Sequence, residues 1–355
     1  MTARVEAPTL NEWLSKTLLH TGLDSLGAQS LAEQMVTADL LGRSSHGSAL
    51  LPTYLGSIES GSISKTSTWT LVNDRDGSIL IDLHHSVGAV GLLELQTLLV
   101  EKAKNSGIAM GAIRNASHIG ALQVHLLPYI ERDLVVLVSA TNPAYRSMAH
   151  PEGKRPVTTS NPIAFGAPGS SKPILVDISA TTQSNSYFQA LHARGLRAPG
   201  PWLKDSEGRT TDEPSVLLEE PPGTVLPIGA PDLAYKGFAL SLFAEIFALA
   251  LSGGGRTNVH APDSESVFVM VIDPEAVGGL AFLHDEIDAL LETTRESGAV
   301  GDHEPRLPGE RALQMRKEQN ALGIELPVNV IRELEAVGER FQNPFPTLAS
   351  TMQTR

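Results

Sequence analysis

The chain has 355 residues, of which 41% are hydrophobic and 19% charged, a composition typical of soluble globular proteins. Its formal net charge is -13, which disfavours nucleic acid and anionic membrane surfaces, because both are bound by clustered Lys and Arg. The absence of cysteine excludes disulfides, thiolate nucleophiles and Cys-ligated zinc, and no apolar run is long enough to span a membrane. We therefore expect a cytoplasmic protein that binds a small molecule, and neither nucleic acid nor membrane.

Helical patterns dominate both ends of the chain, and strands alternate with helices in between. Helices are predicted at residues 9–20, 26–42, 52–60, 92–105, 121–132 and 236–252. Strands are predicted at 78–83, taken as the first of the chain, and at 108–114, 134–139, 173–178 and 266–272. The helix over 236–252 is apolar nearly all round, which favours a central position. The Pro-, Gly- and acid-rich stretch 197–227 predicts a long excursion on the surface or over a site.

This order of elements predicts an α/β (or α+β) fold in which helices flank a mixed sheet and the two termini build a helical lobe. We expect three parts, over residues 1–75, 76–275 and 276–355. A doubly wound nucleotide-binding sheet carries a G-x-G-x-x-G turn after an early strand, and none occurs here. The glycines at 253–255 follow a helix and indicate a helix C-cap. Any dinucleotide is therefore bound without the usual turn, on a non-Rossmann sheet.

Two histidines stand beside small polar residues where an element is predicted to end. His46 lies between Ser45 and Gly47 after a helix, and His118 follows a strand and precedes Gly120. An imidazole with a near-neutral pKa suits proton donation to a substrate. The alternative for each is a histidine that caps an element or packs in the core. No H-E-x-x-H or comparable spacing appears, so we expect no metal site.

Other polar groups are placed where an anion or a charged histidine needs support. Asp177 ends an apolar strand and can orient a histidine, with Ser179 and Thr181 following it; alternatively it caps the next turn. Lys236 and Gly237 open a helix whose N-terminal amides suit a phosphate, unless the lysine is simply solvated. The turn at Gly309-Glu310 exposes amides in the same way, as a weaker signal.

Taken together, these segments resemble the type 2 malate/L-lactate dehydrogenase family, which includes ureidoglycolate and sulfolactate dehydrogenases and reductases of cyclic imino acids. The resemblance is carried in order along almost the whole chain. The matching segments are Ser45-His46-Gly47 with Tyr54, residues 115–120, Thr141-Asn142, residues 160–165, residues 177–182, Lys236-Gly237, residues 307–311 and Gly323-Ile324.

The resemblance implies a homodimer with its own non-Rossmann fold that moves hydride between NADPH, or NADH, and a 2-oxo or 2-imino acid. It implies His46 or His118 as the proton donor, Asp177 as its support, and Ser45 and Tyr54 facing the substrate. The first part would carry the substrate-side histidine and the second the cofactor. The implied cofactor-binding residues are Ser160, Asn161, Ile178, Ser179, Thr181, Lys236, Gly237, Gly309 and Glu310.

The chain departs from the family pattern at the substrate. Leu50 stands where the family has an arginine that pairs with the substrate carboxylate. His150 and Glu152 replace a proline and a glycine of the family pattern, and Arg146 in the same loop is a candidate substitute cation. We therefore expect Leu50, Tyr54, Arg146 and His150 on the substrate side.

The leading hypothesis is an NAD(P)H-dependent reductase of a C=N or C=O bond next to a carbonyl, on an atypical substrate because Leu50 replaces the arginine. Either Arg146 supplies the missing cation, or the carboxylate of the substrate is absent or masked. A 2-hydroxy acid dehydrogenase of the malate or lactate kind is the first alternative. The second is a family member without redox activity, which serves as a binding or non-redox protein.

Overall fold

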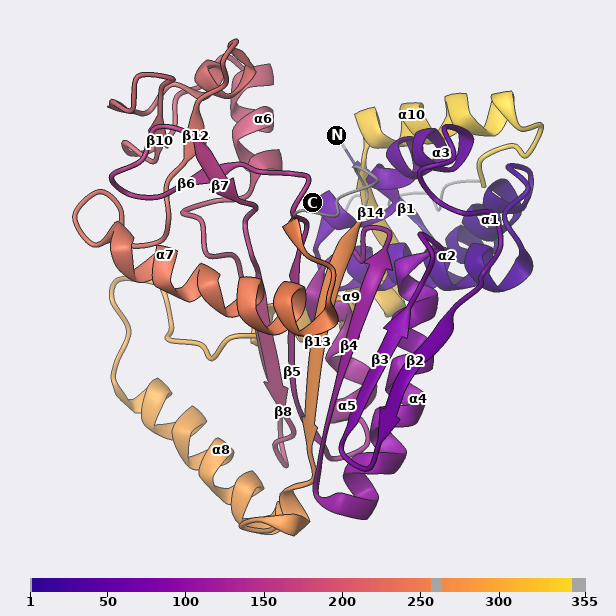
Figure 1. Cartoon of the computed structure of the whole chain (residues 1–355), viewed down its shortest axis with the longest axis vertical. Coiled ribbons are helices and arrows are strands. Elements are labelled where there is room, and N and C mark those ends of the chain that lie inside the picture. The colour runs from indigo at the N-terminus through magenta and orange to yellow at the C-terminus, as the bar shows by residue number, and fades with distance from the viewer. Residues whose placement is uncertain (1, 257–263, 347–355) are drawn as a thin grey trace.

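The computed structural model describes residues 2–256 and 264–346, and its centre is a seven-stranded sheet (Figure 1). The strands in spatial order are β2 (Thr70–Arg75), β3 (Ser78–Asp82), β4 (Ile108–Ala116), β13 (Glu265–Ile272), β5 (Val135–Thr141), β8 (Ile163–Ala167) and β9 (Ile174–Ile178). β3 and β4 pair in parallel, and the other neighbouring strands pair antiparallel. A doubly wound sheet needs repeated parallel pairs. The predicted α/β fold with a mixed, non-Rossmann sheet is confirmed.

One face of this sheet is covered by helices and forms the main core. Val267, Val269 and Val271 alternate along β13 and are buried against the long helix α4 (Gly88–Ser106) and the short helix α5 (Leu127–Ile130). The helix predicted over 121–132 is instead a 3-10 turn, Leu122–His125, followed by α5. Pro128 explains the break, because it lies in the first turn of α5, where proline is favoured.

The two ends of the chain fold together into one lobe (Figure 1). The helices α1 (Ala7–Leu19), α2 (Ser25–Leu40) and α3 (Leu51–Glu59) share a core with α10 (Val328–Arg340). β1 (Thr2–Val5) pairs antiparallel with β14 (Ile324–Pro327). The predicted helical lobe from the two termini is thus observed.

Two strands precede the one that the sequence indicated as the first. β1 and β2 both lie upstream of β3, so the prediction that 78–83 opens the strands is wrong. All six residues of β2 are exposed. An edge strand without a buried face has no alternating apolar pattern, so periodicity did not reveal it.

A second, small sheet lies to one side of the large one. Its strands are β11 (Thr210–Thr211), β10 (Leu203–Lys204), β12 (Thr224–Val225), β6 (Met148–Ala149) and β7 (Pro156–Thr158). Helix α6 (Asn185–Ala193) buries Phe188 against Leu203 and Val225 in a core of its own. The stretch 197–227, expected as a surface excursion, therefore supplies three strands and part of a core.

The helix predicted as central is not enclosed. α7 (Ala234–Phe243) continues into a π-helical segment, Ala244–Ala250, and together they cross one end of the sheet (Figure 1). Leu240, Ile246 and Leu251 are 47%, 53% and 55% exposed. The apolar residues all round this helix thus leave one face open in the single chain. Helices α8 (Leu280–Glu296) and α9 (Glu310–Leu322) complete the described fold, in which no helix combines the length and apolarity needed to cross a membrane.

Candidate active site

A cleft of about 400 Å³ opens where the helical lobe meets the ends of the central strands. His46 reaches it from the 3-10 turn Ser44–His46, Tyr54 from α3, and His118 from the loop after β4. The other lining residues are Ser45, Leu50, Thr53, Ser57, Ile63, Ile119, Gly120, Leu122, Ala140, Thr141, Asn142, Tyr145, Thr159, Ser160, Pro162, Ser184, Asn185, Ser186 and Glu265. The two histidines that the sequence singled out are therefore in one cavity.

The histidines form a small polar cluster with Tyr54. The rings of His46 and His118 are stacked with their centroids 5.9 Å apart. The Tyr54 hydroxyl and His118 Nδ1 are 2.8 Å apart, and Gln34 Nε2 donates to the same hydroxyl at 3.2 Å. Tyr54 and Gln34 are buried, at 2% and 3% exposure. His118 is therefore held by a buried chain of hydrogen bonds, as precise positioning of a reacting group requires.

The turn that carries His46 is fixed from beneath by Asp39. This carboxylate, near the end of α2, is 4% exposed and accepts the Ser48 backbone N–H at 2.8 Å. Burial raises the pKa of Asp39 to about 6, against the opposing effect of its bonds to Ser48. Gly47 is required here, because a Cβ at this position would lie 1.8 Å from Asp39 Oδ1. Within the turn, the Ser45 hydroxyl lies 2.9 Å from His46 Nδ1.

Asp177 faces the histidines from the end of β9. Its Oδ2 accepts the Gln123 backbone N–H at 3.0 Å, and the Gln123 side chain accepts from Arg43 Nε at 2.9 Å. Burial raises the pKa of Asp177, while the charges of Arg43 and His46 work in the opposite direction. Burial and the neighbouring His118 lower the pKa of His46 to about 4. His46 is consequently neutral at pH 7, and Asp177 lies close enough to influence it.

Several predicted cofactor residues are brought together beside the cleft. Ala180 N–H donates to the Ser160 carbonyl at 2.8 Å, which joins the loop before β8 to the segment after β9. Thr181 bridges to Pro227, and Thr181 Oγ1 donates to Ser179 Oγ at 3.0 Å. Ile178, next to them, is 47% exposed.

The helix start at Lys236 and Gly237 joins the same region. A Cβ on Gly237 would lie 2.4 Å from the Ile228 carbonyl oxygen, and Ile228 N–H donates to Ala180 at 2.8 Å. Gly237 thus allows α7 to approach the backbone that carries Thr181. Lys236, in the first turn of α7, is exposed.

Both polar atoms of the Asn161 side chain are hydrogen-bonded within the protein. Its Oδ1 accepts from Thr141 at 2.7 Å, and its Nδ2 donates to the Ser241 carbonyl at 2.9 Å and to Glu245 Oε1 at 2.7 Å. Glu245 also pairs with Arg256. This network ties the start of β8 to the π-helical segment, so the backbone of Asn161 is what it offers to a cofactor.

Gly309 and Glu310 lie at the edge strand β9 and do not line the cleft. Gly309 has a φ of 99°, and a Cβ there would lie 2.7 Å from Leu175 Cβ. Glu310 accepts from Lys172 at 2.8 Å and from Arg295 at 2.9 Å. Burial raises its pKa, but these cations and the Leu307 N–H outweigh burial and lower it. This pair anchors α9 to the sheet.

Only two of the four residues expected on the substrate side line the cleft. Leu50 and Tyr54 line the cleft, but Arg146 and His150 do not. Arg146 Nε donates to the Pro143 carbonyl at 3.2 Å, and the His150 ring lies edge-on to Phe238 with centroids 4.8 Å apart. No Lys or Arg is among the described residues that line the cleft, whereas Glu265 is. The described lining of the cleft therefore offers an anionic substrate group no Lys or Arg side chain.

Sequence reasoning missed the residues that support the histidines, namely Gln34, Asp39, Arg43 and Gln123. They lie inside helices or turns and carry no local motif. Only Asp39 had a possible signal, as a carboxylate on the otherwise apolar face of a predicted helix. Among the described residues, no group of three or more His, Asp or Glu side chains is arranged to hold a metal ion.

Comparison with known proteins agrees with this fold and identifies the family. The family model described as malate/L-lactate dehydrogenase matches residues 5–335. The Delta(1)-pyrroline-2-carboxylate/Delta(1)-piperideine-2-carboxylate reductase of Pseudomonas syringae pv. tomato is 29% identical over 334 residues, 91% of this chain and 93% of the relative. The L-sulfolactate dehydrogenase of Methanothermobacter thermautotrophicus is 26% identical over 312 residues, 86% of this chain and 87% of the relative.

The same architecture occurs among solved structures. The malate dehydrogenase of Entamoeba histolytica superposes with a TM-score of 0.91 at 23% identity, covering 98% of this chain and all of the other. That likeness concerns the fold, and the family match over most of the sequence identifies the chain. The protein belongs to the malate/L-lactate dehydrogenase family of NAD(P)H-dependent oxidoreductases.

Proposed function

We propose that this enzyme reduces a C=N or C=O bond next to a carbonyl in a substrate whose carboxylate is absent or masked, with NADPH preferred over NADH. The supporting observation is a cleft that holds two histidines but, among its described lining residues, no Lys or Arg. Burying a carboxylate without a paired cation costs several kcal/mol. A C=N bond, as in a cyclic imine, is the favoured target, because the family includes cyclic imine reductases.

We assign the role of proton donor to the substrate to His118. Two stacked imidazoles repel each other when both are charged, and the lowered pKa of His46 leaves His46 neutral. A protonated His118 donates from Nδ1 to the Tyr54 oxygen 2.8 Å away and keeps Nε2–H for the substrate. His46 then orients the substrate, with Asp177 beside it. The nicotinamide, when bound, supplies the hydride.

The residues beside the cleft fit a dinucleotide. The hydroxyls of Thr158 and Thr182 are buried there without a hydrogen-bond partner among the described residues, although a buried hydroxyl normally has one. We assign the hydroxyls of Ser160, Ser179 and Thr181 to ribose or phosphate, together with Lys236 at the N-terminal turn of α7, where the helix dipole favours an anion. Ile178, Gly237 and the backbone of Asn161 shape the same wall. Gly309 and Glu310 take part only by holding β9 in place.

A 2-hydroxy acid dehydrogenase is the second candidate, favoured by the malate and sulfolactate dehydrogenases among the relatives. In that case Arg146 must move into the cleft to pair with the carboxylate.

The test begins with a fluorescence titration of NADPH and NADH into the purified enzyme. Oxidation of the bound cofactor is then followed with 1-pyrroline-2-carboxylate and with its carboxamide, two imines that differ in the charge next to the C=N bond. We expect kcat/KM for the carboxamide to exceed that for the carboxylate by about tenfold or more. A preference for the carboxylate that Arg146→Ala removes contradicts the absent or masked carboxylate, and faster turnover of a 2-oxo acid than of either imine establishes the second candidate. Binding of neither cofactor rejects both.

We also infer a homodimer, because one face of the sheet exposes an apolar row. Met110, Met270, Leu137 and Phe165 are in register across four strands, and Met110 and Phe165 are each 43% exposed. Phe268, on the same face, is covered by Phe247 of the π-helical segment, whose own outer face is open. A second copy of the chain that packs on this surface buries both the apolar row of the sheet and the outer face of the π-helical segment.

Light scattering after gel filtration tests the homodimer. Twice the chain mass is expected, with Ile246→Glu shifting the protein to monomer. Leu19→Glu, on the helical lobe, is the matched control. A monomeric unchanged protein contradicts the inference.

A further inference from the structure

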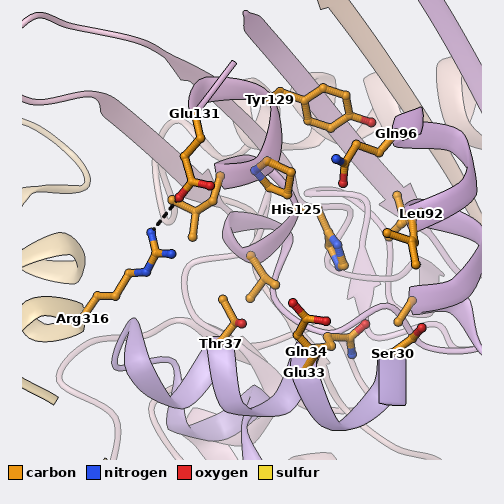
Figure 2. A pocket seen from close by; sticks show the side chains of 15 residues that line it. Ser30, Glu33, Gln34, Thr37, Leu92, Gln96, His125, Tyr129, Glu131 and Arg316 are labelled. Atoms are coloured by element: carbon orange, nitrogen blue, oxygen red, sulfur yellow. Dashed lines mark hydrogen bonds and ion pairs between the residues drawn. The ribbon is translucent and has the colours of Figure 1, made fainter. Parts of the chain in front are cut away.

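A second pocket of about 200 Å³ lies behind the histidine cluster, between α2, α4 and α5 (Figure 2). α2 lines it with Ser30, Glu33, Gln34 and Thr37, and α4 with Ala89, Leu92, Leu93 and Gln96. Both sets follow the spacing i, i+3, i+4, i+7, so one whole face of each helix borders the pocket. The remaining lining residues are Val124, His125, Leu127, Pro128, Tyr129, Glu131 and Arg316.

Two buried polar atoms in the residues that line this rear pocket lack partners within the described structure. Gln34 Oε1 and the Tyr129 hydroxyl are buried and have no hydrogen bond within the described residues, and their residues are 3% and 2% exposed. Buried polar atoms in native proteins rarely remain unsatisfied. Both residues belong to the wall of the rear pocket, so an occupant reaches these two covered atoms only where the neighbouring side chains shift.

Among the polar groups that line the rear pocket, hydrogen-bond acceptors outnumber donors. His125 Nε2 donates to the Ile119 carbonyl at 2.7 Å, which leaves Nδ1 of the neutral ring as an acceptor. Glu33 is exposed at the pocket, and the structure gives its carboxylate no hydrogen bond or ion pair among the described residues. Arg316, the cation of the lining, is paired with Glu131 at 3.1 Å (Figure 2). An occupant that donates hydrogen bonds and carries a positive charge matches the Glu33 carboxylate and His125 Nδ1, while the Tyr129 hydroxyl can donate or accept.

Apolar side chains provide the rest of the surface, through Leu92, Leu93, Val124, Leu127 and Pro128. Figure 2 shows Glu33 and Gln34 on one side of the pocket, Tyr129 and Gln96 on the other, and His125 between them. A small molecule with a flat or short apolar part and one ammonium group matches this arrangement of apolar and polar side chains.

We propose that the rear pocket binds a small organic ammonium ion, with the ammonium between Glu33 and Gln34 and the apolar body against Leu92 and Leu127. The site adjoins the catalytic cluster, because Gln34 bonds to Tyr54 and His125 bonds to the carbonyl next to His118. The occupant therefore supports the residues that hold His118 without entering the cleft.

Isothermal titration calorimetry with benzylammonium tests this, with benzyl alcohol as the neutral probe of the same shape. We expect saturable binding of benzylammonium with a Kd of the order of 1 mM, as suits a ligand of this size, and at least tenfold weaker binding of benzyl alcohol. Equal binding of the two, or no saturable binding of benzylammonium, overturns the proposal.

Two variants locate the site. Glu33→Gln is expected to weaken benzylammonium binding about five- to tenfold, while Glu101→Gln, an exposed position on α4 outside the pocket, leaves it unchanged. Leu93→Trp, at a position 45% exposed, is expected to fill the pocket and abolish binding. Binding that survives both Glu33→Gln and Leu93→Trp lies elsewhere and overturns the proposal. Calorimetry needs no turnover, so its outcome is separate from that of the proposed reaction.

Discussion

The cleft and the rear pocket share one wall but differ in how their polar groups are satisfied. In the cleft, Tyr54 and His118 bond to each other, and Glu265 accepts the Ile119 N–H at 3.1 Å. Across the wall, Gln34 Oε1 and the Tyr129 hydroxyl have no partner among the described residues. The side chains that we assign to proton transfer are held by hydrogen bonds within the protein, whereas the unpartnered groups behind them have no hydrogen bond in the described structure. The difference separates a preorganised reaction site from a recognition site.

The largest effect is expected at His118. Replacing it with Ala removes the proton donor and should lower kcat by about 10²- to 10⁴-fold, with the NADPH Kd unchanged. His46→Ala should cost less, because His46 is neutral and only orients the substrate. Single-turnover kinetics measures both, and a larger loss in His46→Ala would reverse the assignment.

Leu50 tests whether the cleft lacks only a cation. Leu50→Arg should raise kcat/KM for 1-pyrroline-2-carboxylate over its carboxamide by about 10- to 100-fold, because a charge-assisted bond to a carboxylate contributes about 1.5–3 kcal/mol. Leu50→Met keeps the size and polarity and serves as the control. An unchanged ratio means that the carboxylate end of the substrate lies away from position 50.

Tyr54 connects the two sides of the wall. Tyr54→Phe removes the oxygen that both His118 and Gln34 contact. We expect kcat to fall by about tenfold with little change in KM, since His118 loses orientation while substrate contacts remain. The acidic limb of the kcat–pH profile should move as well; a KM effect alone argues for a packing role.

The last effect concerns not turnover but acid stability, through His125, which lies on the rear side. Burial is the main reason that its pKa falls to about 4, against 6.5 for an unperturbed histidine. Between these values the unfolded chain takes up a proton that the folded chain does not, so stability falls as pH falls. From pH 7.5 to 4.5 this costs about 2–3 kcal/mol.

His125→Gln should remove this pH dependence, although it lowers stability at neutral pH. Urea unfolding at several pH values shows whether the gap between variant and parent narrows on acidification by the expected amount. The exposed His20→Gln is the matched control, and a gap independent of pH contradicts the lowered pKa.

Some of the site could be predicted from sequence because its residues carry local signals. His46 and His118 stand beside small residues at element ends, Tyr54 was implied by the family resemblance, and the structure places all three in one cleft. Gln34 and Gln123 could not be found, since they act through contacts 20 and 54 residues apart in sequence. Leu50 indicated a changed substrate. The position of Arg146 could not be predicted, because it depends on the conformation of a loop, and the residue type alone does not determine that conformation.

The fold shows the same limit. Buried strands such as β5 and β13 have apolar runs that identify them, whereas β1 is recognisable only through its pairing with β14. The open face of α7 has the composition of a buried helix, because sequence does not tell whether apolar side chains meet their own chain or another.

The pairing of β1 with β14 also has a consequence for synthesis. A ribosome releases Thr2–Val5 about 320 residues before the partner strand Ile324–Pro327 appears. Until then the apolar faces of α1 and α2 lack the cover that α10 provides, for the tens of seconds that translation of this length takes. The nascent amino-terminal helices are therefore a natural client for chaperones, and the lobe that carries His46 is completed last.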